Sequence, residues 1–241
     1  MSQTNRSFTF LPALILSLGI AAAGYFVGQT MYNSSVGINT AEVKGLAERR
    51  VEADRAFWRI QYTVTGRDEA AMQALYEKSK ADRSKIVGIL LESGFGEAEI
   101  TPGVVDYNHQ EFRDDDQVLV EERFYLTGSI EVETDKVRLV SEARSKLNEL
   151  IAQGVDIRNN APSYYFTGLN EIKPEMLKEA TTNARLAANE FASNAGVDVG
   201  GIRSARQGGF IIKDVGENYS DTMKIEKDVR VVTTISFYLT K

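Results

Sequence analysis

The sequence predicts an α+β domain that follows one N-terminal transmembrane helix. Three observations lead to this class: an uncharged apolar stretch near the N-terminus, three amphipathic helical patterns that each end in glycine, and several segments in which apolar and polar residues alternate. The predicted element order is βαββαβαββ, and its first six elements match a split βαβ arrangement. We therefore expect a mainly antiparallel sheet with the three helices on one face.

Residues 1–32 are predicted to be a membrane anchor or a signal segment. No charge occurs from 7 to 41, and the run FLPALILSLGIAAAGYFVGQTMY is long enough, at about 20 residues, to cross a bilayer as a helix. The alanines at 21–23 would suit signal-peptide cleavage, but the apolar run continues through Val27. This continuation favours an uncleaved anchor.

Residues 33–41 (NSSVGINTA) are small and polar, which indicates a short tether, and residues 42–241 are expected to form the folded domain. Cations flank both ends of the anchor, so their count leaves the orientation open. Because long domains are translocated largely regardless of charge, we expect the N-terminus inside and the domain outside.

Three helices are predicted in the domain. The first covers about 68–92, the second follows Thr134 as its capping residue, and the third begins with Pro174 in its first turn. Each pattern ends in glycine followed by an apolar residue, which is typical of a left-handed helix cap. The apolar stripes are Met72, Leu75, Ile86, Ile89 and Leu90; Val137, Val140, Leu147, Leu150 and Ile151; and Met176, Ala180, Ala184, Ala187, Phe191 and Ala195.

Strands are predicted where the apolar period changes to two. Weaker strands are expected at 99–112, 162–170 and 201–213. The three strongest strands have buried faces formed by Ala56, Trp58, Ile60, Tyr62 and Val64; by Val120, Phe124, Leu126, Ile130 and Val132; and by Val229, Val231, Ile235, Phe237 and Leu239.

The chain's one histidine, His109, lies in the acidic segment YNHQEFRDDDQVLVEERF. Strand patterns on both sides of RDDDQ indicate a hairpin with this stretch as its turn, where Asp is favoured for local reasons. On an extended strand His109 and Glu111 point to the same side, which leaves a metal site open. An exposed His beside solvated acids is the simpler interpretation, and no role is assigned to His109.

Composition offers little for catalysis. The chain has 28 Lys and Arg against 34 Asp and Glu, and its net charge of -6 argues against binding nucleic acid. It has no cysteine and lacks both the G-x-S-x-G elbow and the G-x-x-x-x-G-K-[ST] loop. We expect no enzyme activity, no cofactor, and no catalytic, cofactor-binding or metal residues.

Three segments together resemble the SIMPL domain family: VKGLAERRVEADRAFWRIQYTVTG, then EITPGVVDYNHQ, and later EATTNARLAANEFASNAGVDVGGIRSARQGG. The resemblance covers the chain from about Glu42 onward. Ala47 and Ala53 depart from it, because many members have Gly and Pro there. The resemblance implies a bacterial envelope protein without established catalytic residues, and some members assemble into rings. The members are secreted or anchored by the N-terminus, so the resemblance implies an external address. Together with the predicted anchor, we expect a single-pass protein of the bacterial inner membrane with its C-terminal domain in the periplasm.

Two functions are compatible with these features. The first is a non-enzymatic, membrane-anchored envelope domain that self-associates into a homo-oligomer, in envelope maintenance or stress tolerance. It rests partly on the last predicted strand, whose outer residues Val232 and Tyr238 make a weakly charged edge. The alternative is a module that binds a small apolar or lipid-like ligand in a cavity lined by Trp58, Phe124, Tyr164 or Phe166.

Overall fold

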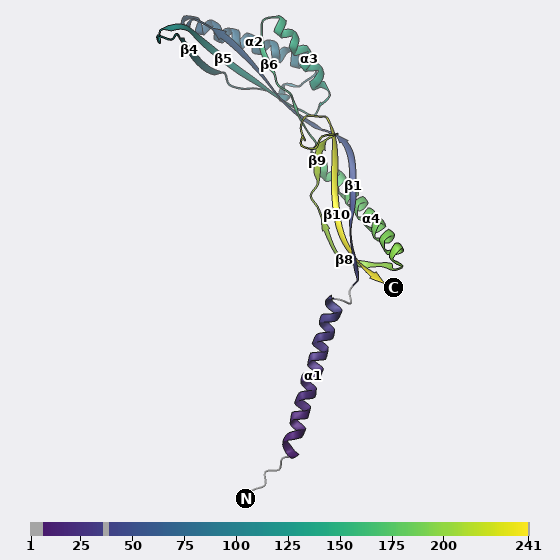
Figure 1. Cartoon of the computed structure of the whole chain (residues 1–241). Coiled ribbons are helices and arrows are strands. Elements are labelled where there is room, and N and C mark those ends of the chain that lie inside the picture. The colour runs from purple at the N-terminus through teal and green to yellow at the C-terminus, as the bar shows by residue number, and fades with distance from the viewer. Residues whose placement is uncertain (1–6, 36–38, 241) are drawn as a thin grey trace. The chain divides into compact units, whose positions relative to one another are not determined.

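The computed structural model describes residues 7–35 and 39–240 (Figure 1). These residues form an α+β structure with four α-helices and antiparallel sheets, in agreement with the predicted class. The chain divides into two compact units. The first contains Met1–Ala47, Leu177–Gly209 and Val231–Lys241, and the second contains Glu48–Met176 and Phe210–Arg230. The prediction of a single sheet is wrong: the strands form two sheets.

Helix α1 covers Ser7–Ser35. The span Pro12–Tyr32 has a mean hydropathy of 1.5, and its most apolar part is not buried by the rest of the protein. The predicted N-terminal helix is therefore present and is long and apolar enough to cross a membrane. Of the predicted tether, residues 36–38 lie outside the described residues, while α1 ends at Ser35 and strand β1 begins at Thr40.

The second unit contains a six-stranded sheet in the order β3-β5-β2-β6, with β4 also paired to β5 and β7 to β2. Strands β2 and β5 form its centre and pair antiparallel, from Ala56 opposite Thr134 to Gly66 opposite Phe124. The strands are β2 (Arg55–Gly66), β3 (Ile100–Pro102), β4 (Asp106–Arg113), β5 (Leu119–Thr134), β6 (Asp156–Asn159) and β7 (Ser163–Tyr165).

Helices α2 (Met72–Glu92) and α3 (Leu139–Ala152) pack on one face of this sheet (Figure 1). The predicted alternation of β2 is confirmed, because its residues from Ala56 to Val64 are buried at every second position. In β5 the prediction fails at Val120, which is 68% exposed near the hairpin turn. The shared core includes Trp58, Ile60, Ile86, Leu90, Ile130, Val132, Val140 and Leu147.

The other sheet has the order β1-β10-β8, and β9 also pairs with β10. The last predicted strand exists, but it lies between β1 and β8, so the expectation that it offers a free edge is wrong. Strand β1 was not predicted, because its end lies in the charged stretch ERRVEADR, which continues through the turn at Asp54 into β2. The strands are β1 (Thr40–Glu52), β8 (Asp198–Gln207), β9 (Ile211–Asp214) and β10 (Glu226–Thr240).

Helix α4 (Leu169–Ala195) packs on this other sheet, so three helices do not share one sheet face as predicted. Its expected start is also wrong, because Pro174 lies inside the helix. Ala187, Phe191 and Ala195 are exposed, contrary to the predicted stripe. The buried residues repeat at every fourth position and are Met176, Ala180, Ala184, Ala188 and Ala192.

The early start of α4 coincides with contacts that are distant in sequence. Asp54, in the turn between β1 and β2, accepts hydrogen bonds from the backbone N–H of Thr167 at 2.9 Å and of Gly168 at 2.9 Å. It also accepts one from the Thr167 hydroxyl at 3.0 Å. These bonds stabilise the segment that leads into α4, as a capping side chain does.

The three predicted glycine caps are confirmed. Gly94, Gly154 and Gly196 have φ values of 101°, 81° and 68°. The next residue in each case donates its N–H back to the helix, as Phe95 does to Leu90 O at 3.2 Å. The expected start of α3 is wrong, since Thr134 ends β5, and its hydroxyl accepts from Lys136 N at 3.0 Å instead.

Candidate functional site

The hairpin formed by β4 and β5 has the predicted acidic turn. Asp114 Oδ1 accepts hydrogen bonds from the backbone N–H groups of Asp116 at 3.0 Å and Val118 at 2.8 Å. Gln117 has a positive φ of 63°, which completes the reversal. Asp114 therefore serves the turn itself, as the local argument from sequence predicted.

His109, Glu111 and Glu122 meet on one face of this hairpin. Strand pairing places Glu111 directly opposite Glu122, and His109 opposite Phe124. One potential ligand atom from each of the three side chains lies within 4.8 Å of the others, and His109 Nε2 is 3.9 Å from Glu122 Oε1. The sequence placed His109 and Glu111 on one side but missed Glu122.

Glu122 was missed because of an irregularity in the strand pairing. The register shifts between Phe112 and Arg113, so that Arg113 faces Leu119 whereas Phe112 faces Glu121. Without the shift, Glu111 would face Glu121. A shift of one residue decides which side chains share a face, and no sequence signal locates this shift.

Charged neighbours surround the cluster. Arg113 donates to Glu111 Oε2 through Nη2 at 2.6 Å and Nε at 3.1 Å. The Arg113 guanidinium holds the pKa of Glu111 below its ordinary value, and His109 acts in the same direction. Arg123 pairs with Glu121 instead, and its hydrogen bond lowers the pKa of Glu121.

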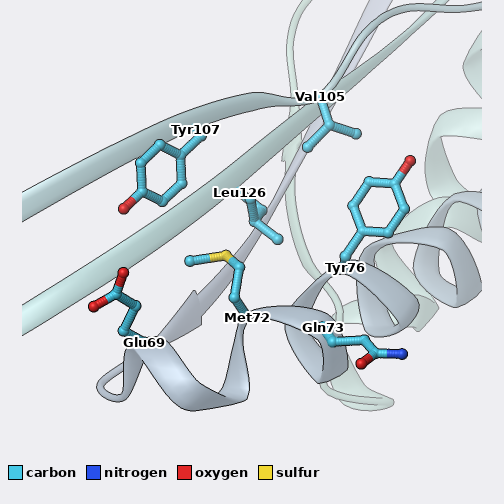
Figure 2. A pocket seen from close by; sticks show the side chains of 7 residues that line it. All are labelled: Glu69, Met72, Gln73, Tyr76, Val105, Tyr107 and Leu126. Atoms are coloured by element: carbon cyan, nitrogen blue, oxygen red, sulfur yellow. The ribbon is translucent and has the colours of Figure 1, made fainter.

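An open groove of about 730 Å³ lies beside this cluster, between α2 and the hairpin strands. In Figure 2 Met72 and Leu126 occupy its middle, with Tyr107 and Tyr76 on either side. The adjacent core contains Val64, Leu75, Phe124 and Leu126, so the floor of the groove is apolar. Glu69 and Gln73 supply polar groups at its rim.

This groove is not the cavity that the sequence suggested. Trp58 and Tyr164 are buried in the main core of the second unit, and Trp58 Nε1 donates to Asn160 O at 3.1 Å. Phe124 is packed in the smaller core beneath the groove. These three rings therefore fill the space between the sheet and its helices and do not line a cavity there. Phe166, the fourth residue of the predicted lining, is half-buried and belongs to neither core.

A buried ion pair was also missed. Lys227 Nζ lies 2.5 Å from Asp214 Oδ1, and both side chains are 0% exposed. Asp214 also accepts from the Ser220 hydroxyl and from Met223 N. Lys and Asp are almost never fully buried unless they are paired. The sequence alone therefore predicts that both side chains are exposed, and no sequence signal marks the pair.

The family comparison agrees with the resemblance seen in the sequence. A family model described as "SIMPL: Protein of unknown function (DUF541)" matches residues 41–236, which is most of the chain. No curated protein matches the chain. The match begins in β1 and ends in β10, so it includes the hairpin and the groove. The chain therefore belongs to the SIMPL family.

Proposed function

We propose that the protein is a non-enzymatic, single-pass protein of the bacterial inner membrane whose periplasmic domain self-associates in envelope maintenance or stress tolerance. The apolar helix α1, with Pro12–Tyr32 as the span, supports the anchor. The observation that carries self-association is the exposed strand β4. All residues of β4 are exposed, and among the described residues β4 pairs with β5 alone.

Strand β4 lacks two residue types that usually protect a free edge, although it carries the charged residues Asp106, Glu111 and Arg113. It contains neither Lys nor Pro, and its backbone is available to a second strand. Two copies paired antiparallel about Gln110 would place His109 of one opposite Glu111 of the other, and Tyr107 opposite Arg113. These pairs are complementary in charge or suited to a cation–π contact, so the edge is complementary to itself.

Cysteine cross-linking tests this edge cleanly, because the chain has no cysteine of its own. Gln110→Cys in native membranes should give a disulfide-linked dimer under mild oxidation. Glu149→Cys on the exposed side of α3 is the matched control and should give far less. Equal cross-linking of the two variants, or none with Gln110→Cys, would contradict pairing through β4.

The membrane orientation has a separate test. Tyr219 is fully exposed in the connection between β9 and β10, so Tyr219→Cys offers an accessible thiol. A membrane-impermeant maleimide should label it once the outer membrane is opened, while Ser2→Cys stays protected by the inner membrane. Labelling of Ser2→Cys alone would contradict this orientation. An intact mass equal to that of a chain beginning near Gly24 would show that the N-terminal segment is cleaved and is not an anchor.

The groove between α2 and the hairpin favours a second candidate, a module for a small apolar or lipid-like ligand. Its apolar middle and its volume of about 730 Å³ are in the range of small-molecule sites. A photoactivatable fatty acid in native membranes should label peptides that contain Met72 or Tyr76. Met72→Gln should reduce this labelling, whereas Met223→Gln, at an exposed methionine elsewhere, should not. Labelling confined to α1 would rule against the groove.

A further inference from the structure

The cluster on the hairpin has the composition of a metal site. His109 supplies an imidazole nitrogen, and Glu111 and Glu122 supply carboxylate oxygens, within 4.8 Å of one another. We propose that these three side chains bind one divalent transition-metal ion, with Zn²⁺ as the representative. The three ligands come from one chain, although the β4 pairing proposed above also uses His109 and Glu111.

Strand pairing, and not a loop, holds the three groups together. Glu111 and Glu122 are direct partners across the antiparallel pair, and His109 lies two residues before Glu111 on the same face. Two like charges in direct opposition destabilise a strand pair. A bound cation removes that repulsion, so metal binding and hairpin stability favour the same arrangement.

The imidazole is positioned by a ring beneath it. His109 stacks on Phe124 with ring centroids 4.6 Å apart and an angle of 2° between the planes. Phe124 is only 2% exposed, because it packs with Val64, Leu75 and Leu126. A buried ring therefore fixes the plane of the imidazole while Nε2 faces Glu122 at 3.9 Å. This support lowers the entropic cost of placing the ligand.

The carboxylates keep free oxygens for a metal. Both hydrogen bonds from Arg113 reach Oε2 of Glu111, so they do not use Oε1. Glu122 pairs with His109, and this is an ion pair only when the imidazole is protonated. A neutral His109 can instead bind the metal through a ring nitrogen, which leaves the Glu122 carboxylate free to bind the same metal. One nitrogen and two oxygens suit Zn²⁺ and other first-row ions, and three protein ligands leave a position for water.

The test uses the full chain in detergent, stripped with a chelator and titrated with Zn²⁺ alone by calorimetry. We expect one ion per chain. His109→Ala and Glu122→Gln should each weaken binding by at least about tenfold. Glu121→Gln is the matched control, because Glu121 is the adjacent residue on the opposite face, and it should leave the affinity unchanged.

A further variant tests whether Glu111 is a ligand. Arg113→Gln releases Glu111 from its ion pair and should tighten Zn²⁺ binding several-fold, and this gain should be lost when His109→Ala is added. Far-UV circular dichroism of each variant checks folding. Absence of stoichiometric Zn²⁺ in the unmodified chain would overturn the proposal. Equal affinity of the unmodified chain and the folded His109→Ala variant would do the same.

Discussion

Lys227 and Asp214 form an ion pair in which neither side chain is exposed to solvent. Lys227 also donates to Asp221 O at 2.7 Å, and Asp214 accepts from Met223 N at 2.8 Å. The pair thus holds the connection between β9 and β10, which carries the fully exposed Tyr219.

Lys227→Met should destabilise the second unit by about 3–5 kcal/mol, because it leaves the Asp214 carboxylate buried without its cation. Urea unfolding followed by the fluorescence of Trp58, the single tryptophan, measures this change. Lys224→Met is the control: Lys224 pairs with Glu217 at an exposed site, and its loss should cost less than about 1 kcal/mol. Equal losses of unfolding free energy in the two variants would show that the buried pair stabilises the protein no more than the exposed pair does.

The lowered pKa of Asp214 predicts that the stability of the protein depends on pH in acid. Burial opposes its ionisation, but Lys227, the Ser220 hydroxyl and Met223 N outweigh burial and lower the pKa of Asp214 from 3.8 to about 2. The stabilisation, of the order of 2 kcal/mol, is complete above pH 3.8 and is lost as the pH falls through about 2. Unfolding free energies between pH 5 and 2 should therefore fall less steeply in Asp214→Asn. Identical slopes would contradict the lowered pKa.

Gly45→Ala should destabilise the first unit by roughly 1–3 kcal/mol or more. A Cβ at this position of β1 would overlap the backbone O of Ala180 and approach the backbone N of Ala184, and neither atom can move without shifting α4. Gly88→Ala is the opposite control, because a Cβ at this position of α2 meets nothing within 4 Å. This substitution should raise the free energy of unfolding by about 0.5–1 kcal/mol, since Ala favours a helix more than Gly does. Thermal unfolding by circular dichroism distinguishes the two, and a stable Gly45→Ala would refute the close packing.

Asp54→Ala should cost about 1–2 kcal/mol, because the N–H groups of Thr167 and Gly168 lose their acceptor. The loss should be local, so hydrogen exchange should quicken at the start of α4 and remain unchanged in α2. Asp68→Ala provides a comparison, since Asp68 caps the short helix before α2 through Ala70 N alone. Unchanged exchange at Thr167 and Gly168 would show that Asp54 does not hold this helix start.

Local signals predicted the elements that depend on local physics. The glycine caps at Gly94, Gly154 and Gly196 follow from the left-handed backbone, and the alternation of β2 follows from one buried face. The start of a helix was missed where it depends on a distant residue. The segment before α4 is held by Asp54, which lies far from it in the sequence. Strand partners were likewise unpredictable, so β10 was placed at an edge when it lies between two strands.

The candidate sites show the same division. The hairpin turn could be predicted because Asp114 bonds within the turn itself. Glu122 and the register shift at Phe112 could not, because they depend on pairing across two strands. The apolar groove was missed for a related reason: Met72 and Leu126 meet only after α2 packs on the hairpin.

Light scattering of the detergent-solubilised full chain, with the detergent mass subtracted, tests self-association most directly. At tens of micromolar, roughly the range in which a specific interface holds, the protein mass should be a multiple of 26.7 kDa. Gln110→Lys, which places a charge on the β4 edge, should lower this mass while leaving the fold intact. A mass of 26.7 kDa for the unmodified chain under these conditions would contradict self-association and favour the ligand-binding groove.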